Sequence, residues 1–142
     1  MKKLKIAGYQ GDGSVHTRSV KFFIEKVSNY FDISFDQDIT EKEQKAASLI
    51  EMTMNNEIQI SYLWSSYYEK YIPEIKLLDL PFFFKSKNEV KSLINKNLQP
   101  YVSNELIKKN NLKLLGFWDN GSRHISTNKN IIKTQDSCKN LK

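Results

Sequence analysis

Hydrophobic residues in the first sixty positions alternate between the period of a strand and the period of a helix. Residues 4–9 and 32–38 carry apolar side chains at alternate positions, and residues 58–62 form a third short apolar segment. Residues 15–30 and 40–54 instead carry apolar side chains three and four positions apart, as on one face of a helix. This order predicts an α/β fold with a parallel-type sheet flanked by helices.

Capping residues mark the predicted ends of these two helices. Ser14 is placed to cap the first helix after the break at Gly11–Gly13. Thr40 and Glu43 have capping-box spacing and predict the start of the second helix, which Asn55-Asn56 should end. The residues expected on the apolar faces are Val15, Phe22, Phe23, Val27 and Tyr30 in the first helix, Ile33 and Phe35 in the second strand, and Ala46, Ala47, Leu49, Ile50 and Met54 in the second helix.

The next forty residues predict mainly helices. A short helix is expected over 66–71, before Pro73, and an extended apolar connection over 77–84. Ser86 and Glu89 form another capping box, and apolar residues follow at helical spacing up to Leu98.

A separate helix should begin at Pro100 and end with Lys108-Lys109, where positive charge suits the helix dipole, and Asn110-Asn111 should stop it. After this helix, residues 113–118 and 123–127 predict two strands joined by an Asp119-Asn120-Gly121 turn.

Length and composition indicate a packed globular chain. The 142 residues suit one domain, and 39% are hydrophobic. The single cysteine excludes an intrachain disulfide and a cysteine-based zinc site. No apolar run approaches the roughly 20 residues of a membrane span, so no direct membrane insertion is expected.

The net charge of +6 does not by itself indicate nucleic-acid binding. Of the 22 basic residues, only Arg18 and Arg123 are arginines, whereas nucleic-acid readers place arginine where bidentate contacts matter. The lysines are scattered, and Lys, Asn and Ile all use A/T-rich codons. Composition bias therefore explains the surplus better, and we expect no nucleic-acid partner.

Other candidate sites have simpler interpretations. Gly11 and Gly13 lie where a phosphate loop would lie, but the third glycine and the Lys-Ser/Thr pair of such loops are absent. Asp32, Asp36 and Asp38 share a strand face without the spacing of a calcium loop, so a solvated strand edge is favoured over a metal site. No nucleophile elbow surrounds Ser122, which argues against a hydrolase. We expect neither enzyme activity nor a cofactor.

Two features suit ligand binding. Arg123 follows a turn, and its planar guanidinium could hold a carboxylate through two hydrogen bonds, although an ordinary surface ion pair is the simpler explanation from the residue alone. Aromatic residues also gather with serines after the third strand, where open α/β sheets bind ligands. They are Tyr62, Trp64, Tyr67, Tyr68 and Tyr71, with Ser61, Ser65 and Ser66.

Several motifs together resemble the N-terminal half of the solute-binding proteins of TRAP (tripartite ATP-independent periplasmic) transporters, the DctP-like family. The most distinctive is Gly116-Phe117-Trp118-Asp119-Asn120-Gly121-x-Arg123-His124. The others are Leu4–Tyr9, Phe23-x-x-x-Val27, Asn56-Glu57-Ile58-Gln59-Ile60, Ser65-Ser66-Tyr67, Pro73-Glu74-Ile75, Leu78-Asp79-Leu80-Pro81-Phe82, and Lys133-Thr134 through Cys138-Lys139 to Leu141-Lys142.

The resemblance implies a two-lobed clamp that binds a small organic acid, often a carboxylate, and delivers it to a membrane permease. It implies that Arg123 lines the cleft, which reverses the ion-pair interpretation. The expected ligand-binding residues are Arg123, Tyr9, Gln10, Trp64, Ser65, Ser66, Tyr67 and Asn120.

The resemblance also implies an incomplete protein. Residues 1–120 would form lobe I, and residues 121–142 a crossover strand and the start of lobe II. The resemblance implies a periplasmic location. Residues 1–10 do not form a signal peptide, so from the residues alone the chain is either cytoplasmic or has had a signal removed, with Met1 an added start. The alternative to a binding subunit is a truncated or decayed fragment that binds no ligand and associates through its exposed lobe interface.

Overall fold

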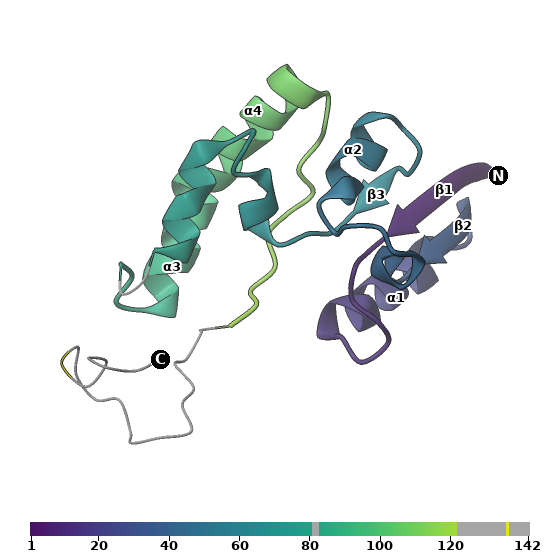
Figure 1. Ribbon diagram of the computed structural model, residues 1–142, viewed down its shortest axis with the longest axis horizontal. Coiled ribbons are helices and arrows are strands. Elements are labelled where there is room, and N and C mark those ends of the chain that lie inside the picture. The colour runs from purple at the N-terminus through teal and green to yellow at the C-terminus, as the bar shows by residue number, and fades with distance from the viewer. Residues whose placement is uncertain (81–82, 122–135, 137–142) are drawn as a thin grey trace.

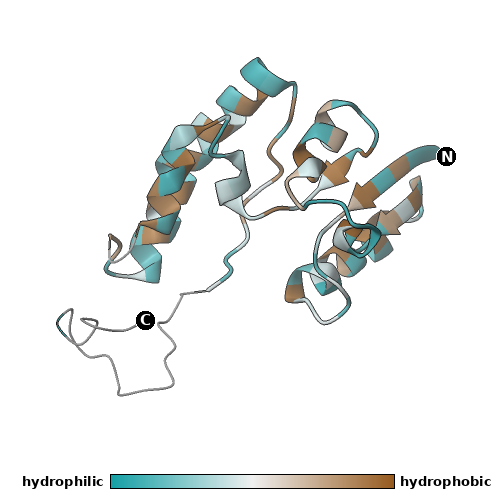
Figure 2. Cartoon of the chain, in the orientation of Figure 1, coloured by the Kyte–Doolittle hydropathy of each residue, from teal (hydrophilic) through white to brown (hydrophobic). Residues whose placement is uncertain are grey.

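A parallel three-stranded sheet forms the centre of the N-terminal half of the computed structural model, which describes residues 1–80, 83–121 and 136. The strand order is β2-β1-β3, with β1 at Lys2–Ala7, β2 at Phe31–Asp36 and β3 at Ile60–Ser61. The predicted parallel α/β architecture is confirmed (Figure 1). Hydrophilic and hydrophobic residues alternate along β1 (Figure 2).

The two strand pairings of β1 differ in length. β1 pairs with β2 along its full length, from Lys2 opposite Phe31 to Ala7 opposite Asp36. Its pairing with β3 covers only two residues on each strand, so the third strand is shorter than the predicted 58–62. Ile33 and Phe35 of β2 are partly buried, in line with their predicted inward direction.

Helix α1 (Val15–Val27) begins as predicted, because the Ser14 side chain accepts a hydrogen bond from the backbone N–H of His16 at 3.1 Å. Its predicted apolar face was wrong except at Val27, which is partly buried. The structure buries Thr17 and Val20, whereas Val15, Phe22, Phe23 and Tyr30 are exposed. Thr17 tolerates full burial because its hydroxyl has hydrogen-bond partners, which a search for apolar residues alone does not anticipate.

The predicted capping box at Thr40 was wrong, and the second helix begins later. Asp38 takes the capping position instead, and its Oδ1 accepts from the backbone N–H of Thr40 at 2.9 Å and from the Thr40 hydroxyl. One 3₁₀ turn, η1 (Ile39–Lys42), follows and ends where Glu43 adopts a φ of 63°. Helix α2 covers only Ser48–Met54, and Asn56, with a φ of 59°, ends it as predicted.

Two 3₁₀ helices follow β3: η2 (Ser65–Tyr68) and η3 (Pro73–Asp79). Residues 77–79 are therefore helical, which contradicts the predicted extended connection. Pro73 at the first position of η3 explains where that helix begins, because proline lacks the N–H that a first turn leaves unpaired.

Residues 87–110 form one uninterrupted helical run rather than two helices. It consists of α3 (Lys87–Leu93), the π-helical segment η4 (Ile94–Leu98) and α4 (Gln99–Asn110). Pro100, predicted to begin a new helix, instead follows the π-helical segment within the run. Such segments often occur next to residues, such as proline, that interrupt regular helical hydrogen bonds.

The ends of this run follow the sequence prediction. Ser86 Oγ accepts from the backbone N–H of Glu89 at 3.2 Å, and the Glu89 carboxylate accepts from the N–H of Lys85. Asn111, with a φ of 53°, stops the run. Residues 113–118 then continue without forming the predicted strand, because they pair with none of the strands in the described part of the chain.

Two buried hydrophobic clusters hold these elements together. The sheet cluster contains Ala7, Ile39, Leu49 and Ile58. The helix cluster contains Ile50, Ile72, Ile75, Leu98, Val102, Leu106 and Leu112. Leu49 and Ile50 are neighbours in α2, and Leu63 packs against both clusters. Helix α2 therefore joins the sheet to the helical run at residues 87–110.

We predict that Ile50→Ala lowers the free energy of unfolding by about 2–4 kcal/mol, because it leaves a cavity beside a side chain that is only 2% exposed. Ile107→Ala on α4 is the matched control, since Ile107 is 51% exposed and its truncation should cost less than about 1 kcal/mol. Urea unfolding of both variants measures the difference. Equal losses would contradict the role assigned to α2.

Candidate functional site

Residues that follow β1 and β3 meet at one edge of the sheet. The two strands are parallel, so the segments that leave Ala7 and Ser61 emerge side by side. The rings of Tyr9 and Tyr62 lie 5.9 Å apart, and the ring of Tyr67 meets Tyr9 edge-on at 6.0 Å. The structure thus brings together two of the predicted site residues, Tyr9 and Tyr67, from separate segments.

Two aromatic residues that were not predicted for the site complete this group. His16 stacks on Trp118 with ring centroids 5.7 Å apart and an interplanar angle of 17°. Tyr62 lies 6.1 Å from His16 and 5.9 Å from Trp118, so the three rings contact one another. We call the five rings the aromatic cluster: Tyr9, His16, Tyr62, Tyr67 and Trp118.

Gln10 connects the end of β1 to the first turn of α1. Its side-chain oxygen accepts hydrogen bonds from Ser14 Oγ at 2.6 Å and from His16 Nδ1 at 3.0 Å. Its backbone carbonyl accepts from Thr17 Oγ1 at 2.5 Å, and Thr17 Oγ1 lies 3.0 Å from the Tyr62 hydroxyl. The predicted site residue Gln10 therefore holds the neighbouring ring of His16 in place.

Gly8 lets the ring of Tyr62 approach the backbone of the sheet edge. A Cβ atom at this position would overlap the ring and lie 2.6 Å from the Tyr62 hydroxyl oxygen. Only glycine lacks this atom, so the close packing of Tyr62 depends on it.

Trp64 and Ser66 share a partner that the sequence analysis did not assign. The carboxylate of Asp79, at the end of η3, accepts hydrogen bonds from Trp64 Nε1 at 3.4 Å and from the Ser66 hydroxyl. Ser65 begins η2 between them and is partly buried. The motif Leu78-Asp79-Leu80 was noted in the sequence, but it gave no indication that Asp79 would accept a hydrogen bond from Ser66, 13 residues earlier.

Asn120 lies in the predicted turn, close in sequence to the aromatic cluster. Asp119 Oδ1 accepts from the backbone N–H of Gly121 at 2.8 Å, and Gly121 has a φ of 79°, which favours glycine. The predictions for Arg123, Ser122, His124, Cys138 and the strand at 123–127 lie outside the described residues.

Burial changes the acidity of the tyrosines in the cluster. Desolvation raises the pKa of Tyr9 above 10.0, and the neighbouring Tyr67 adds to the shift. Desolvation likewise raises the pKa of Tyr62, although the hydrogen bond with Thr17 opposes the shift. Both hydroxyls are therefore neutral hydrogen-bonding groups at neutral pH.

Two of the three residues considered as metal ligands have other partners. Asp36 forms an ion pair with Lys42 at 2.5 Å, and Asp38 caps η1. No cluster of three histidine, cysteine or acidic side chains that could hold a metal ion occurs in residues 1–80, 83–121 and 136.

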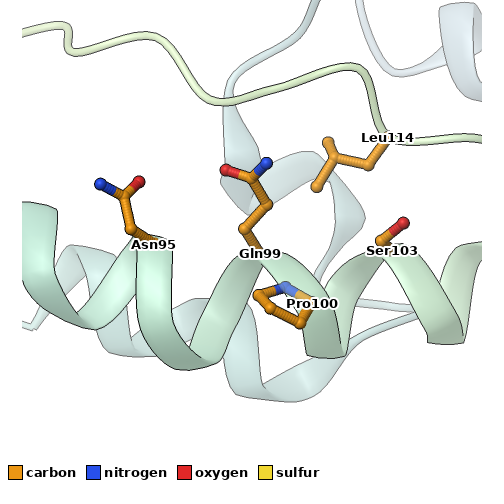
Figure 3. Close-up of a pocket in the computed structure, with 5 residues that line it drawn as sticks. All are labelled: Asn95, Gln99, Pro100, Ser103 and Leu114. Atoms are coloured by element: carbon orange, nitrogen blue, oxygen red, sulfur yellow. The ribbon is translucent and has the colours of Figure 1, made fainter.

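A separate hollow of about 410 Å³ lies between α4 and the segment that follows it (Figure 3). Asn95, Gln99, Pro100 and Ser103 line it from the helical run, and Leu114 lies across from them (Figure 3). None of the predicted site residues lines this hollow, so the aromatic cluster at the sheet edge is the better candidate site.

A family model described as bacterial extracellular solute-binding protein, family 7 (DctP) matches residues 13–142. Among curated proteins, the chain is 37% identical to the C4-dicarboxylate-binding protein DctB of Bacillus subtilis over 90 residues, which cover 63% of this chain and 25% of that protein. It is 30% identical to the C4-dicarboxylate-binding periplasmic protein DctP of Vibrio cholerae over 89 residues, 63% of this chain and 26% of that protein.

Two solved structures share the fold. A TRAP periplasmic solute-binding protein from Escherichia fergusonii superposes with a TM-score of 0.66 at 15% identity, over 82% of this chain and 40% of that chain. One from Ochrobactrum anthropi gives a TM-score of 0.64 at 13% identity, over 75% of this chain and 34% of that chain. The chain thus spans about a quarter of the length of the two curated relatives and less than half of these structures.

We predict that Gly8→Ala displaces the Tyr62 ring and lowers the free energy of unfolding by about 1–3 kcal/mol through overpacking. Near-ultraviolet circular dichroism, which reports on aromatic packing, should change as well. Gly13→Ala is the control, because a Cβ there meets nothing within 4 Å. An unchanged aromatic spectrum in Gly8→Ala would contradict the close packing.

We also predict that stability falls at alkaline pH. The raised pKa values of Tyr9 and Tyr62 mean that the folded state favours their neutral forms, so their contribution is complete below pH 10.0 and is lost as pH rises through the folded-state values. Urea unfolding between about pH 9 and pH 11 measures this loss. It should be smaller in the double variant Tyr9→Phe/Tyr62→Phe, and an equal loss in both proteins would contradict the assignment.

Proposed function

The chain belongs to the DctP family of bacterial extracellular solute-binding proteins, and on that basis we propose that it contributes the first lobe of a TRAP transporter subunit that binds a small organic acid. The contact between Trp118 and the rings of His16 and Tyr62 supports this proposal most directly. It brings the chain that leads to Arg123 to the carboxyl edge of the parallel sheet, where such folds bind ligands.

We infer that Arg123 is the anion anchor and that the remaining predicted residues line the site around it. A guanidinium can donate two parallel hydrogen bonds to a carboxylate, which provides both charge and orientation. Tyr9 and Tyr67 offer aromatic surface at the sheet edge, and Tyr67 is 40% exposed. The other proposed lining residues are Gln10, Trp64, Ser65, Ser66 and Asn120.

A C4-dicarboxylate is the first ligand class to test. The relatives from Bacillus subtilis and Vibrio cholerae are described as C4-dicarboxylate-binding proteins. This chain matches about a quarter of each relative, so the ligand class is a proposal for this protein.

A periplasmic location and a membrane permease as partner follow from the same proposal. In the described part of the chain, no helix is long and apolar enough to cross a membrane. Delivery of the ligand to a separate permease would supply the membrane-spanning step.

We predict that Arg123→Gln weakens succinate binding at least about tenfold, equivalent to ~1.4 kcal/mol, because it removes the charge and the bidentate hydrogen bonds. Isothermal titration of the 142-residue chain with succinate, fumarate and malate measures the effect. Arg18→Gln is a matched control that removes the same charge from the other arginine, which is exposed on α1 and donates to the Gly13 carbonyl at 3.4 Å. The affinity of Arg18→Gln for succinate should stay within about twofold of the wild-type affinity.

Two results would contradict this proposal. Binding that survives Arg123→Gln would remove that residue from the site. A chain that melts cooperatively and binds none of the acids would favour the decayed fragment, and sizing would then show whether it associates with a second copy.

A further inference from the structure

We propose that the stack of Trp118 on His16 positions the turn at residues 119–121 and, through it, the proposed anion anchor. His16 and Trp118 are thus positioning residues rather than ligand contacts. The structural part of this inference stands on the ring contacts alone, and its effect on affinity rests on the proposed function.

Trp118 is held by ring contacts more than by burial. Its side chain is 53% exposed, which is unusual for a residue fixed by a hydrophobic core. Yet it stacks on His16 at 5.7 Å and meets Tyr62 at 5.9 Å. Aromatic pairs at such distances contribute about 0.5–1.5 kcal/mol beyond their buried area.

Trp118 can stack on His16 in a defined geometry because two hydrogen bonds fix the orientation of His16. Its backbone N–H donates to the capping Ser14 side chain, and its ring Nδ1 lies 3.0 Å from Gln10 Oε1. The amide oxygen can only accept, so Nδ1 carries the proton and donates. The position of the imidazole is therefore set by α1 and by the end of β1 together.

Trp118 gives the segment before the turn its contact with the sheet edge. Residues 113–118 form no strand with the described residues, and their nearest buried anchor is Leu112 in the helix cluster. Leu114 and Phe117 also pack against that cluster. Trp118 is thus the point at which the segment turns from the helical run to the sheet edge.

A fixed Trp118 restricts where the next residues can lie. Arg123 follows it by five positions, so even a fully extended chain places the two Cα atoms no more than about 18 Å apart. The Asp119–Gly121 hydrogen bond shortens this reach further. Loss of the stack would add the cost of ordering residues 119–121 to ligand binding, and affinity would fall by that cost.

Proton NMR of the full chain tests the stack without any ligand. The chain has two histidines, so a His124→Gln variant identifies the His16 signals. We expect His16 ring protons shifted upfield by the Trp118 ring in the wild type and restored toward random-coil values in Trp118→Leu. The backbone amides of Asn120 and Gly121 should move toward random-coil positions in the same variant.

Matched variants distinguish the positioning role of Trp118 from a general loss of folded structure. Trp118→Phe keeps a ring and should retain part of the upfield shift and the turn signals. Trp64→Leu removes the other tryptophan and should leave the His16 ring and turn signals in place. Random-coil His16 ring signals in the wild type, or turn amides unchanged in Trp118→Leu, would overturn the proposal.

Succinate titration then tests the functional consequence. We expect Trp118→Leu to weaken binding about five- to tenfold in the wild-type background and less than about twofold in Arg123→Gln, because both changes act on the same anchor. An equal loss in both backgrounds would mean that Trp118 touches the ligand, which overturns the positioning role. A wild-type chain that binds no acid contradicts the proposed function, and the NMR result then decides this inference by itself.

Discussion

The arrangement of the described residues depends on two neighbouring side chains that enter different hydrophobic clusters. Leu49 lies in the sheet cluster and Ile50 in the helix cluster, although both belong to the seven-residue helix α2. Successive residues on a helix point about 100° apart, so a short helix with two adjacent apolar residues can lie between two cores. Trp118 follows Leu112 of the helix cluster, so its contact with His16 depends on the residues that join the two clusters, which are α2 and Leu63.

The predictions that succeeded rest on local chemistry. Ser14, Asn56 and Asn111 were identified because capping and left-handed backbone conformations depend on a few neighbouring atoms. Thr40 failed for an equally local reason. Asp38, two residues earlier, accepts from both the N–H and the hydroxyl of Thr40, so the threonine side chain donates instead of capping. Asp38 and Thr40 were both possible capping residues, and the Asp38 carboxylate is a stronger hydrogen-bond acceptor than the Thr40 hydroxyl.

In the candidate site, too, some residues could be predicted from the sequence, whereas contacts between distant residues could not. Tyr9 and Gln10 were predicted from the family resemblance, and the structure gives the physical reason for their position, because they follow β1 and the strand ends of a parallel sheet meet at one edge. His16 and Trp118 are separated by 102 residues, and nothing in either local pattern indicates that their rings stack. The available signals were the position of His16 two residues after the cap and of Trp118 two residues before Asn120-Gly121. Neither position indicates which ring the residue contacts.

Asp79 imposes an electrostatic condition on any anion at this edge. Its carboxylate takes the donors of Trp64 and Ser66, two residues proposed to line the site, so those donors are already committed. A ligand carboxylate nearby would also meet repulsion from Asp79, which no described ion pair neutralises. Uncharged tyrosine hydroxyls cannot offset a full negative charge. Binding of an organic acid here would therefore require a cation, and the proposed Arg123 suits that role better than a lysine would, because a guanidinium fork can hold both carboxylate oxygens.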